Sequence, residues 1–150
     1  MKSNKNLIAA VVALLMSGAA AADNHSVTVN AAVNGSCKFN AASSTVNLTL
    51  DPTASTTATQ GASILYRCTK GTAPTFALAS GSTSSATGGN LVNGAESIAY
   101  TFSSTSGGAG AGMGAGNDKT LSLSVSVNQA NAANVTPATY TDSIAITLTP

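Results

Sequence analysis

The sequence predicts an all-β fold, an antiparallel sandwich of immunoglobulin-like type, and three observations support this prediction. Several short segments alternate apolar and polar residues with a period of two, as half-buried strands do, and few segments have helical periodicity. Turn residues separate these segments. Only 7% of the residues are charged, while Thr, Val and Ile favour pleated strands over helices.

Residues 1–22 have the features of a secretory signal peptide. Lys2 and Lys5 give a positive start, an apolar run follows, and three alanines ending at Ala22 provide a small-residue cleavage site. The apolar run is shorter than the ~20 residues that a membrane span needs, which disfavours an uncleaved anchor. Cleavage after Ala22 leaves a mature chain of residues 23–150, enough for one domain with a modest core.

The next segment, residues 26–33, alternates as a half-buried strand does. Its apolar face consists of Val27, Val29, Ala31 and Val33. We expect residues 23–36 to be a mobile arm. Because such a strand needs a sheet to join, the sheet can belong to another molecule.

The body, residues 37–150, is expected to hold roughly seven strands. The strand segments that alternation predicts are residues 45–50, 63–69, 75–79, 91–92, 97–102, 121–127 and 140–148. Asn93-Gly94 is a strong hairpin-turn signal. Residues 53–61 are expected to be a connection, and the Gly-rich residues 103–117 a mobile surface loop. The last strand has no successor to cover the edge that it leaves open.

Two cysteines, Cys37 and Cys68, remain after the leader. In an oxidising compartment such as a bacterial periplasm, the simple expectation is a disulfide between them. It would pin the end of the arm to a strand of the body. A metal pair and a reactive thiol are the alternatives, but neither has a second cluster of ligands or a neighbouring His.

The mature chain has little that could carry chemistry. It has four basic and five acidic residues, so no basic patch for nucleic acid is expected. No amphipathic helix suggests binding to a membrane surface. The single His, His25, lies in the arm without fixed geometry. The carboxylates are scattered over different loops, and the Gly-rich run lacks the phosphate-loop pattern. We therefore expect no enzyme, no cofactor and no bound metal.

Three stretches resemble the Spore Coat Protein U domain family, which includes the pilins of archaic chaperone–usher systems. They are Val33-Asn-Gly-Ser-Cys37, Tyr66-Arg-Cys68 and the final Thr139-Tyr-Thr-Asp-Ser-Ile-Ala-Ile-Thr-Leu-Thr149. The resemblance implies an incomplete immunoglobulin-like fold with a hydrophobic groove where a strand is missing. A periplasmic chaperone fills the groove first, and at the outer-membrane usher the arm of the next subunit replaces it.

The first hypothesis is therefore a pilin, exported through the periplasm to a cell-surface filament for adhesion and biofilm formation. Val27, Val29, Ala31 and Val33 would be the donor face, with Cys37 and Cys68 locking the fold. The partners would be copies of the same chain, the chaperone and the usher. A tip adhesin or carbohydrate-binding module is a second hypothesis. The third is a self-contained secreted coat protein whose own arm completes the sandwich.

Overall fold

The computed structural model describes residues 23–150, so the predicted signal peptide lies outside the described residues. The chain divides into two units, residues up to Ala32 and residues Val33–Pro150, and each is considered by itself. Residues 23–32 form no helix and no strand. Within the described residues, no helix has the length and apolar character needed to cross a membrane.

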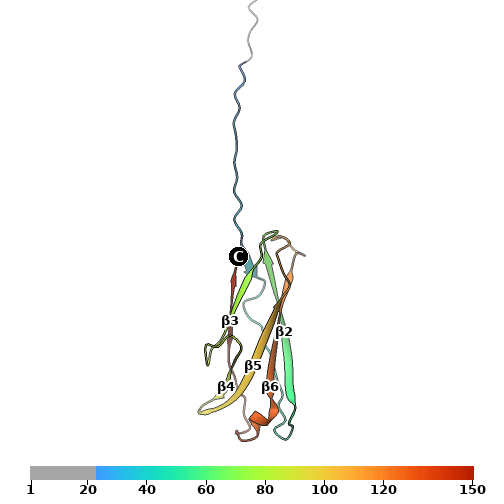
Figure 1. The fold of residues 1–150 in the computed structure, drawn as a ribbon, viewed down its shortest axis with the longest axis vertical. Helices are drawn as coiled ribbons and strands as arrows, with labels where there is room; N and C mark the ends of the chain where they lie inside the picture. The colour runs from blue at the N-terminus through green and yellow to red at the C-terminus, as the bar shows by residue number, and fades with distance from the viewer. Residues whose placement is uncertain (1–22) are drawn as a thin grey trace, which may run out of the picture. The chain divides into compact units, whose positions relative to one another are not determined.

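The second unit is an antiparallel β-sandwich (Figure 1). Its elements in chain order are β1 (Cys37–Phe39), β2 (Thr57–Cys68), β3 (Thr75–Ser80), β4 (Gly88–Asn93), β5 (Glu96–Ser106), β6 (Lys119–Asn128), the short 3-10 helix η1 (Gln129–Ala132) and β7 (Ile144–Thr149). One sheet has five strands in the order β1-β2-β6-β5-β4, and β3 and β7 form the other. The predicted all-β fold is confirmed, and this arrangement is compatible with an immunoglobulin-like sandwich.

Period-two alternation places the core between the two sheets. β6 shows this most clearly, because Leu121, Leu123, Val125 and Val127 are buried while its serines face outward or are half-buried. Near the disulfide, Tyr66 packs its ring edge-on against Phe76 of the facing sheet, with ring centroids 5.0 Å apart.

The disulfide prediction is confirmed. Cys37 and Cys68 are bonded, and they lie directly opposite each other in the β1–β2 pair. Thr69 donates its backbone N–H to the carbonyl oxygen of Ser36, which extends this pairing by one step toward the arm. The bridge therefore fixes the point at which the arm leaves the sandwich.

Several predicted boundaries were wrong, among them that of the strand predicted at residues 91–92, which is β4 and begins at Gly88. β2 starts at Thr57, within the expected connection, because residues 58–66 all pair with β6. Gly61 lies within this strand, where an added Cβ would come 3.0 Å from the Leu123 carbonyl oxygen. β5 extends to Ser106, into the expected Gly-rich loop, and β7 begins only at Ile144.

The expected loop at residues 103–117 is a loop only from residue 107 onward, and it is held against the body at Gly108 and Gly110. Gly110 is buried, donates its N–H to the Thr72 carbonyl and accepts from the N–H of Gly71. Tyr66 donates its hydroxyl to the Gly108 carbonyl at 2.7 Å. Since glycine has no Cβ, this stretch can lie directly on the backbone around Cys68. Glycine here permits close contact between the two backbones.

We expect Gly110→Val to destabilise the sandwich by about 1–3 kcal/mol, because overpacking forces the backbone apart. A Cβ at this position would lie 2.6 Å from both the Cys68 Cβ and the Thr69 carbonyl oxygen. Urea denaturation measures the loss. Gly114→Val is the control, since a Cβ there would meet only the Asn117 amide nitrogen, at 3.5 Å. Equal stability of the two variants would contradict the close contact.

Candidate functional site

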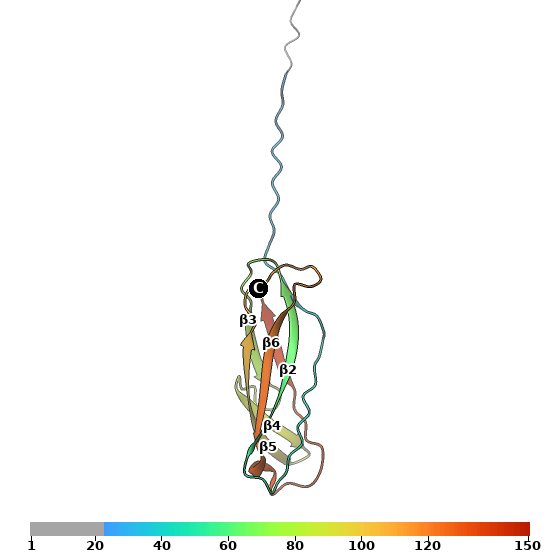
Figure 2. The same ribbon diagram turned by 90° about the vertical axis from the view of Figure 1, so that its right-hand side faces the viewer.

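The most unusual feature of the sandwich is an opening between β7 and β2, and each of these strands has an unpaired edge there. β7 pairs with β3 from Ile144 to Thr149, and within the described residues no strand pairs with its other edge. On the far side of the opening, β1 covers β2 only at residues 66–68. Among the described residues β7 therefore keeps one unpaired edge, and Figure 2 shows the chain after β1 running as a loop along the length of the sandwich.

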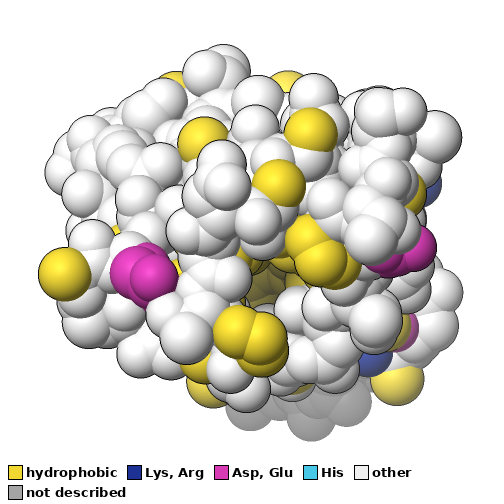
Figure 3. Space-filling view, turned by 90° about the horizontal axis from the view of Figure 1, so that it is seen from below, with side chains coloured by type: hydrophobic (Ala, Val, Ile, Leu, Met, Phe, Trp, Pro, Cys, Tyr) yellow, Lys and Arg dark blue, Asp and Glu magenta, His cyan; other side chains and the backbone are white. Residues whose placement is uncertain are grey.

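This opening is an apolar groove rather than a gap between ribbons. A cavity of about 580 Å³ lies under it, lined on its inner wall by Ile64, Leu123, Val125, Ile144 and Ile146. A second cavity of about 460 Å³ continues it toward η1 and shares Val46, Leu48, Leu91 and Tyr140 with the first. Seen from the η1 end, the surface is hollowed and hydrophobic side chains surround the hollow (Figure 3).

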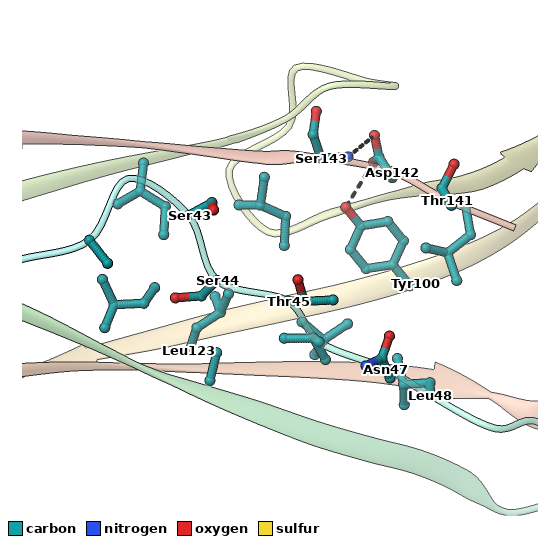
Figure 4. Close-up of a pocket in the computed structure, with 18 of the residues that line it drawn as sticks. Ser43, Ser44, Thr45, Asn47, Leu48, Tyr100, Leu123, Thr141, Asp142 and Ser143 are labelled. Carbon is teal, nitrogen blue, oxygen red and sulfur yellow. Dashed lines mark hydrogen bonds between the residues drawn. The ribbon is translucent and has the colours of Figure 1, made fainter.

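The segment 41–50 lies along this groove. Val46, Leu48 and Leu50 are half-buried and pack against the core, while the residues between them are exposed. Figure 4 shows residues 43–48 between the ribbons, with Leu48 and Leu123 among the lining side chains. The groove is thus covered in part by an alternating segment of the body.

The prediction of a strand at residues 45–50 was wrong in one respect. The alternation is present, but within the described residues no backbone hydrogen bond joins residues 41–50 to a strand. The segment is held at its two ends, where Asn40 N–H donates to the Leu65 carbonyl and Asp51 N–H donates to the Gln129 side chain. It lacks a partner edge, so its backbone N–H and C=O groups remain available.

The carboxylate of Asp142 anchors the segment that leads into β7. Asp142 Oδ2 accepts hydrogen bonds from Ser80 Oγ at 2.6 Å and from Ser82 Oγ and Tyr100 OH at 2.8 Å. Its Oδ1 accepts from the backbone N–H of Ser143 at 2.8 Å (Figure 4). Four parts of the fold thus meet at one side chain: the end of β3, the loop after it, β5 and the segment before β7.

Burial alone would raise the pKa of Asp142, but hydrogen bonds from Ser80, Ser82 and Tyr100 outweigh it and hold that pKa below its usual value. Burial and the bond to this carboxylate raise the pKa of Tyr100 to about 12. The carboxylate is therefore ionised and the phenol protonated near neutral pH. Gly89 makes the cluster possible, since a Cβ there would lie 2.7 Å from Asp142 Oδ2.

We expect Asp142→Asn to destabilise the sandwich by about 1–3 kcal/mol at pH 7, because an amide nitrogen cannot accept these hydrogen bonds. A carboxyl group whose pKa is lowered by folding stabilises the protein above its unfolded pKa of about 3.9, and this stabilisation is lost as the pH falls through the folded pKa. The difference between wild type and variant should therefore be constant above about pH 5 and shrink below about pH 4. Urea denaturation across this range measures it, and a difference independent of pH would contradict the account.

A second carboxylate lies at the η1 end of the groove. Glu96 Oε2 accepts from the hydroxyl of Tyr140 at 2.5 Å, from Thr136 N–H at 3.0 Å and from the Thr136 hydroxyl. These hydrogen bonds, from Thr136 first and then from Tyr140, lower the pKa of Glu96. They fix the connection between η1 and β7, and with it one wall of the second cavity.

The candidate donor face lies on the arm. Val27, Val29 and Val33 are 73, 86 and 87% exposed, and Ala31 is exposed as well. Within the described residues, residues 26–33 join no sheet. The partner of these side chains remains a prediction. By contrast, sequence reasoning missed the role of Asp142, because its hydroxyl partners are 42 to 62 residues away along the chain.

The groove offers backbone edges and apolar side chains, but no arrangement typical of catalysis. In the described part of the chain, no three His, Cys, Asp or Glu side chains come together as a metal site would require. Its two clustered carboxylates are occupied by hydroxyl and backbone donors that hold the fold. The arrangement suits the binding of an extended segment by strand addition.

A comparison with protein families gave a match that covers most of the chain. The family model of the Spore Coat Protein U domain matches residues 23–147, which includes the arm and the sandwich as far as the middle of β7. A search of curated proteins and a search of solved structures gave no match. The match extends over most of the chain, so this protein belongs to the Spore Coat Protein U domain family.

Proposed function

We propose that this chain is a structural pilin subunit that polymerises by donor-strand complementation. The arm of one copy adds as a strand to the groove of the next, between β7 and the segment 41–50. The observation that carries this proposal is the apolar groove with an unpaired edge of β7 along it. Membership of a family of structural domains associated with pilus-like and coat proteins supports it.

Physical complementarity also favours the arm as the occupant. An extended segment supplies N–H and C=O groups to the unpaired edge of β7 and to the segment 41–50, while its alternate side chains point into the groove. Burial of Val27, Val29 and Val33 would contribute roughly 5–9 kcal/mol, an upper figure from area bookkeeping. In water these side chains are exposed, so the arm gains by joining a sheet.

Head-to-tail addition does not close on itself, because each copy brings one arm and one groove. Repeated addition therefore gives a filament. Until the arm of another copy arrives, the open edge of β7 is an aggregation hazard, which a periplasmic chaperone and then an outer-membrane usher would cover. The filament would be displayed at the cell surface and serve in adhesion and biofilm formation.

The test is to purify residues 23–150 without a chaperone and to follow assembly by size-exclusion chromatography and negative-stain microscopy. We expect multimers and filaments. Excess synthetic peptide of residues 23–36 should cap the grooves and shorten the filaments. The same peptide with Ala31→Asp should leave the filament length unchanged. A stable monomer that unfolds in two states and ignores the peptide would favour a self-contained coat protein.

A further inference from the structure

The charges of the sandwich are divided between its two ends. All four basic residues of residues 23–150 lie at the end that carries the disulfide: Lys38 on β1, Arg67 at the end of β2, Lys70 in the following turn and Lys119 at the start of β6. We call this end the basic pole. The one acidic side chain at this end of the sandwich, Asp118, is paired with Arg67, with a nitrogen–oxygen distance of 2.5 Å. Side-chain charge there is therefore clearly positive.

The opposite end, beside η1, carries Asp51 and Glu96, and we call it the acidic pole. Asp51 N–H bonds to Gln129 of η1, and Glu96 holds Thr136 just beyond η1. Their carboxylates accept hydrogen bonds from neutral groups, Thr53 for Asp51 and Thr136 and Tyr140 for Glu96, which lower both pKa values and leave both charges in place. The sequence has no Lys or Arg in residues 120–150 or 39–66 to balance them.

The length of the strands separates the two poles. β6 has ten residues and runs from Lys119 to η1, about 33 Å at 3.3 Å per residue. Because the Debye length is about 8 Å at physiological salt, the poles of one copy scarcely interact with each other. They would interact strongly only with the pole of an adjoining copy.

The arm leaves from the basic pole. Ser36 N–H donates to the Thr69 hydroxyl, and a Cβ on Gly35 would lie 3.3 Å from the Thr72 side chain. Between Val33, the last residue of the donor face, and Cys37 there are only three residues. This linker spans at most roughly 14 Å, so an arm seated in a groove must bring its own basic pole close to the end of that groove.

From this geometry we propose that the basic pole of each copy docks on the acidic pole of the next, and that this charge pairing sets the direction in which the arm lies in the groove. The inference rests on the proposed function. Seated with Val33 at the η1 end, the arm runs antiparallel to β7 and opposite charges meet. Seated the other way, two basic poles would face each other. The groove opens in a hollow at the η1 end, where the arm would enter (Figure 3).

The test compares assembly rates of variants that carry the same net charge. Lys38→Gln/Lys70→Gln removes two positive charges at the basic pole, and Ser63→Glu/Ser103→Glu adds two negative charges at exposed positions on the outer face of the large sheet. At low salt we expect the first variant to assemble about three- to tenfold more slowly than wild type, and the second to assemble nearly as fast as wild type. Raising salt should slow wild type toward the first variant.

A variant in which the charges of both poles are reversed provides the second part of the test. Lys38→Glu/Lys70→Glu should assemble more slowly still, and adding Asp51→Lys/Thr53→Lys should recover part of the rate, because the signs are then reversed at both poles. Equal rates for the two variants of matched net charge, with no effect of salt, would overturn the docking proposal and leave donor-strand assembly standing. Failure of wild type to form any filament would overturn both.

Discussion

Val29→Asp or Ala31→Asp is expected to abolish filaments while leaving the sandwich folded. In the groove either carboxylate would be buried against apolar side chains without a partner, which costs several kcal/mol. In the free chain both positions are exposed, so the thermal midpoint of the sandwich should not change. Negative-stain microscopy of the assembled material, together with a thermal melt, measures both effects.

The opposite face of the same arm provides a matched control. Thr28→Asp and Asn30→Asp add the same charge one residue away, on the face that points out of the groove. These variants should still form filaments. Filaments of normal length from Val29→Asp would refute the donor-strand account, and so would equal loss of filaments from both faces, since strand addition requires a difference between them.

Removal of the disulfide is expected to have the second large effect. The bond joins residues 31 apart, and for a closed loop of about 32 residues the chain-entropy model gives a stabilisation of roughly 3.5–4 kcal/mol. Cys37→Ala/Cys68→Ala should lower the free energy of unfolding by about that amount, measured in urea. A reductant should destabilise wild type similarly and leave the variant unchanged. A loss below about 1 kcal/mol would show that the bridge is not an important constraint.

The sequence predicted the strands best where alternation was long and apolar. Residues 121–127 became the centre of β6, and residues 75–79 became β3, because a buried face fixes such strands. The Asn93-Gly94 hairpin also formed, with Gly94 at φ +61. In each of these places local chemistry and tertiary pairing agree.

Prediction failed where a distant partner decides the outcome. Residues 45–50 alternate as a strand does, yet in the described part of the chain no backbone hydrogen bond joins them to a neighbouring strand. The glycines near residue 110 were expected to be mobile, but their lack of side chains lets them lie on the backbone of Cys68. A period-two pattern specifies which face of a segment is apolar and says nothing of whether its edges find a partner.

The candidate site also has a part that the sequence could predict and a part that it could not. Val27, Val29, Ala31 and Val33 could be chosen from the sequence because the whole pattern lies within one short segment. The groove could not be assembled in that way, since its walls come from β2, β6, β7 and the segment 41–50. Asp142 was hidden for a similar reason, because its hydroxyl partners come from β3, the loop after β3, and β5.

The most direct test of the central claim is a photo-crosslink between copies. A benzophenone amino acid replaces Val29, and chains labelled with nitrogen-15 are mixed with unlabelled chains before assembly and irradiation. The account predicts heavy–light crosslinks, detected by mass spectrometry, from position 29 to peptides that contain residues 41–50 or 139–148. Crosslinks to those peptides only within one chain would show that the arm completes its own sandwich. Crosslinks to the outer face of the large sheet would contradict strand addition in the groove.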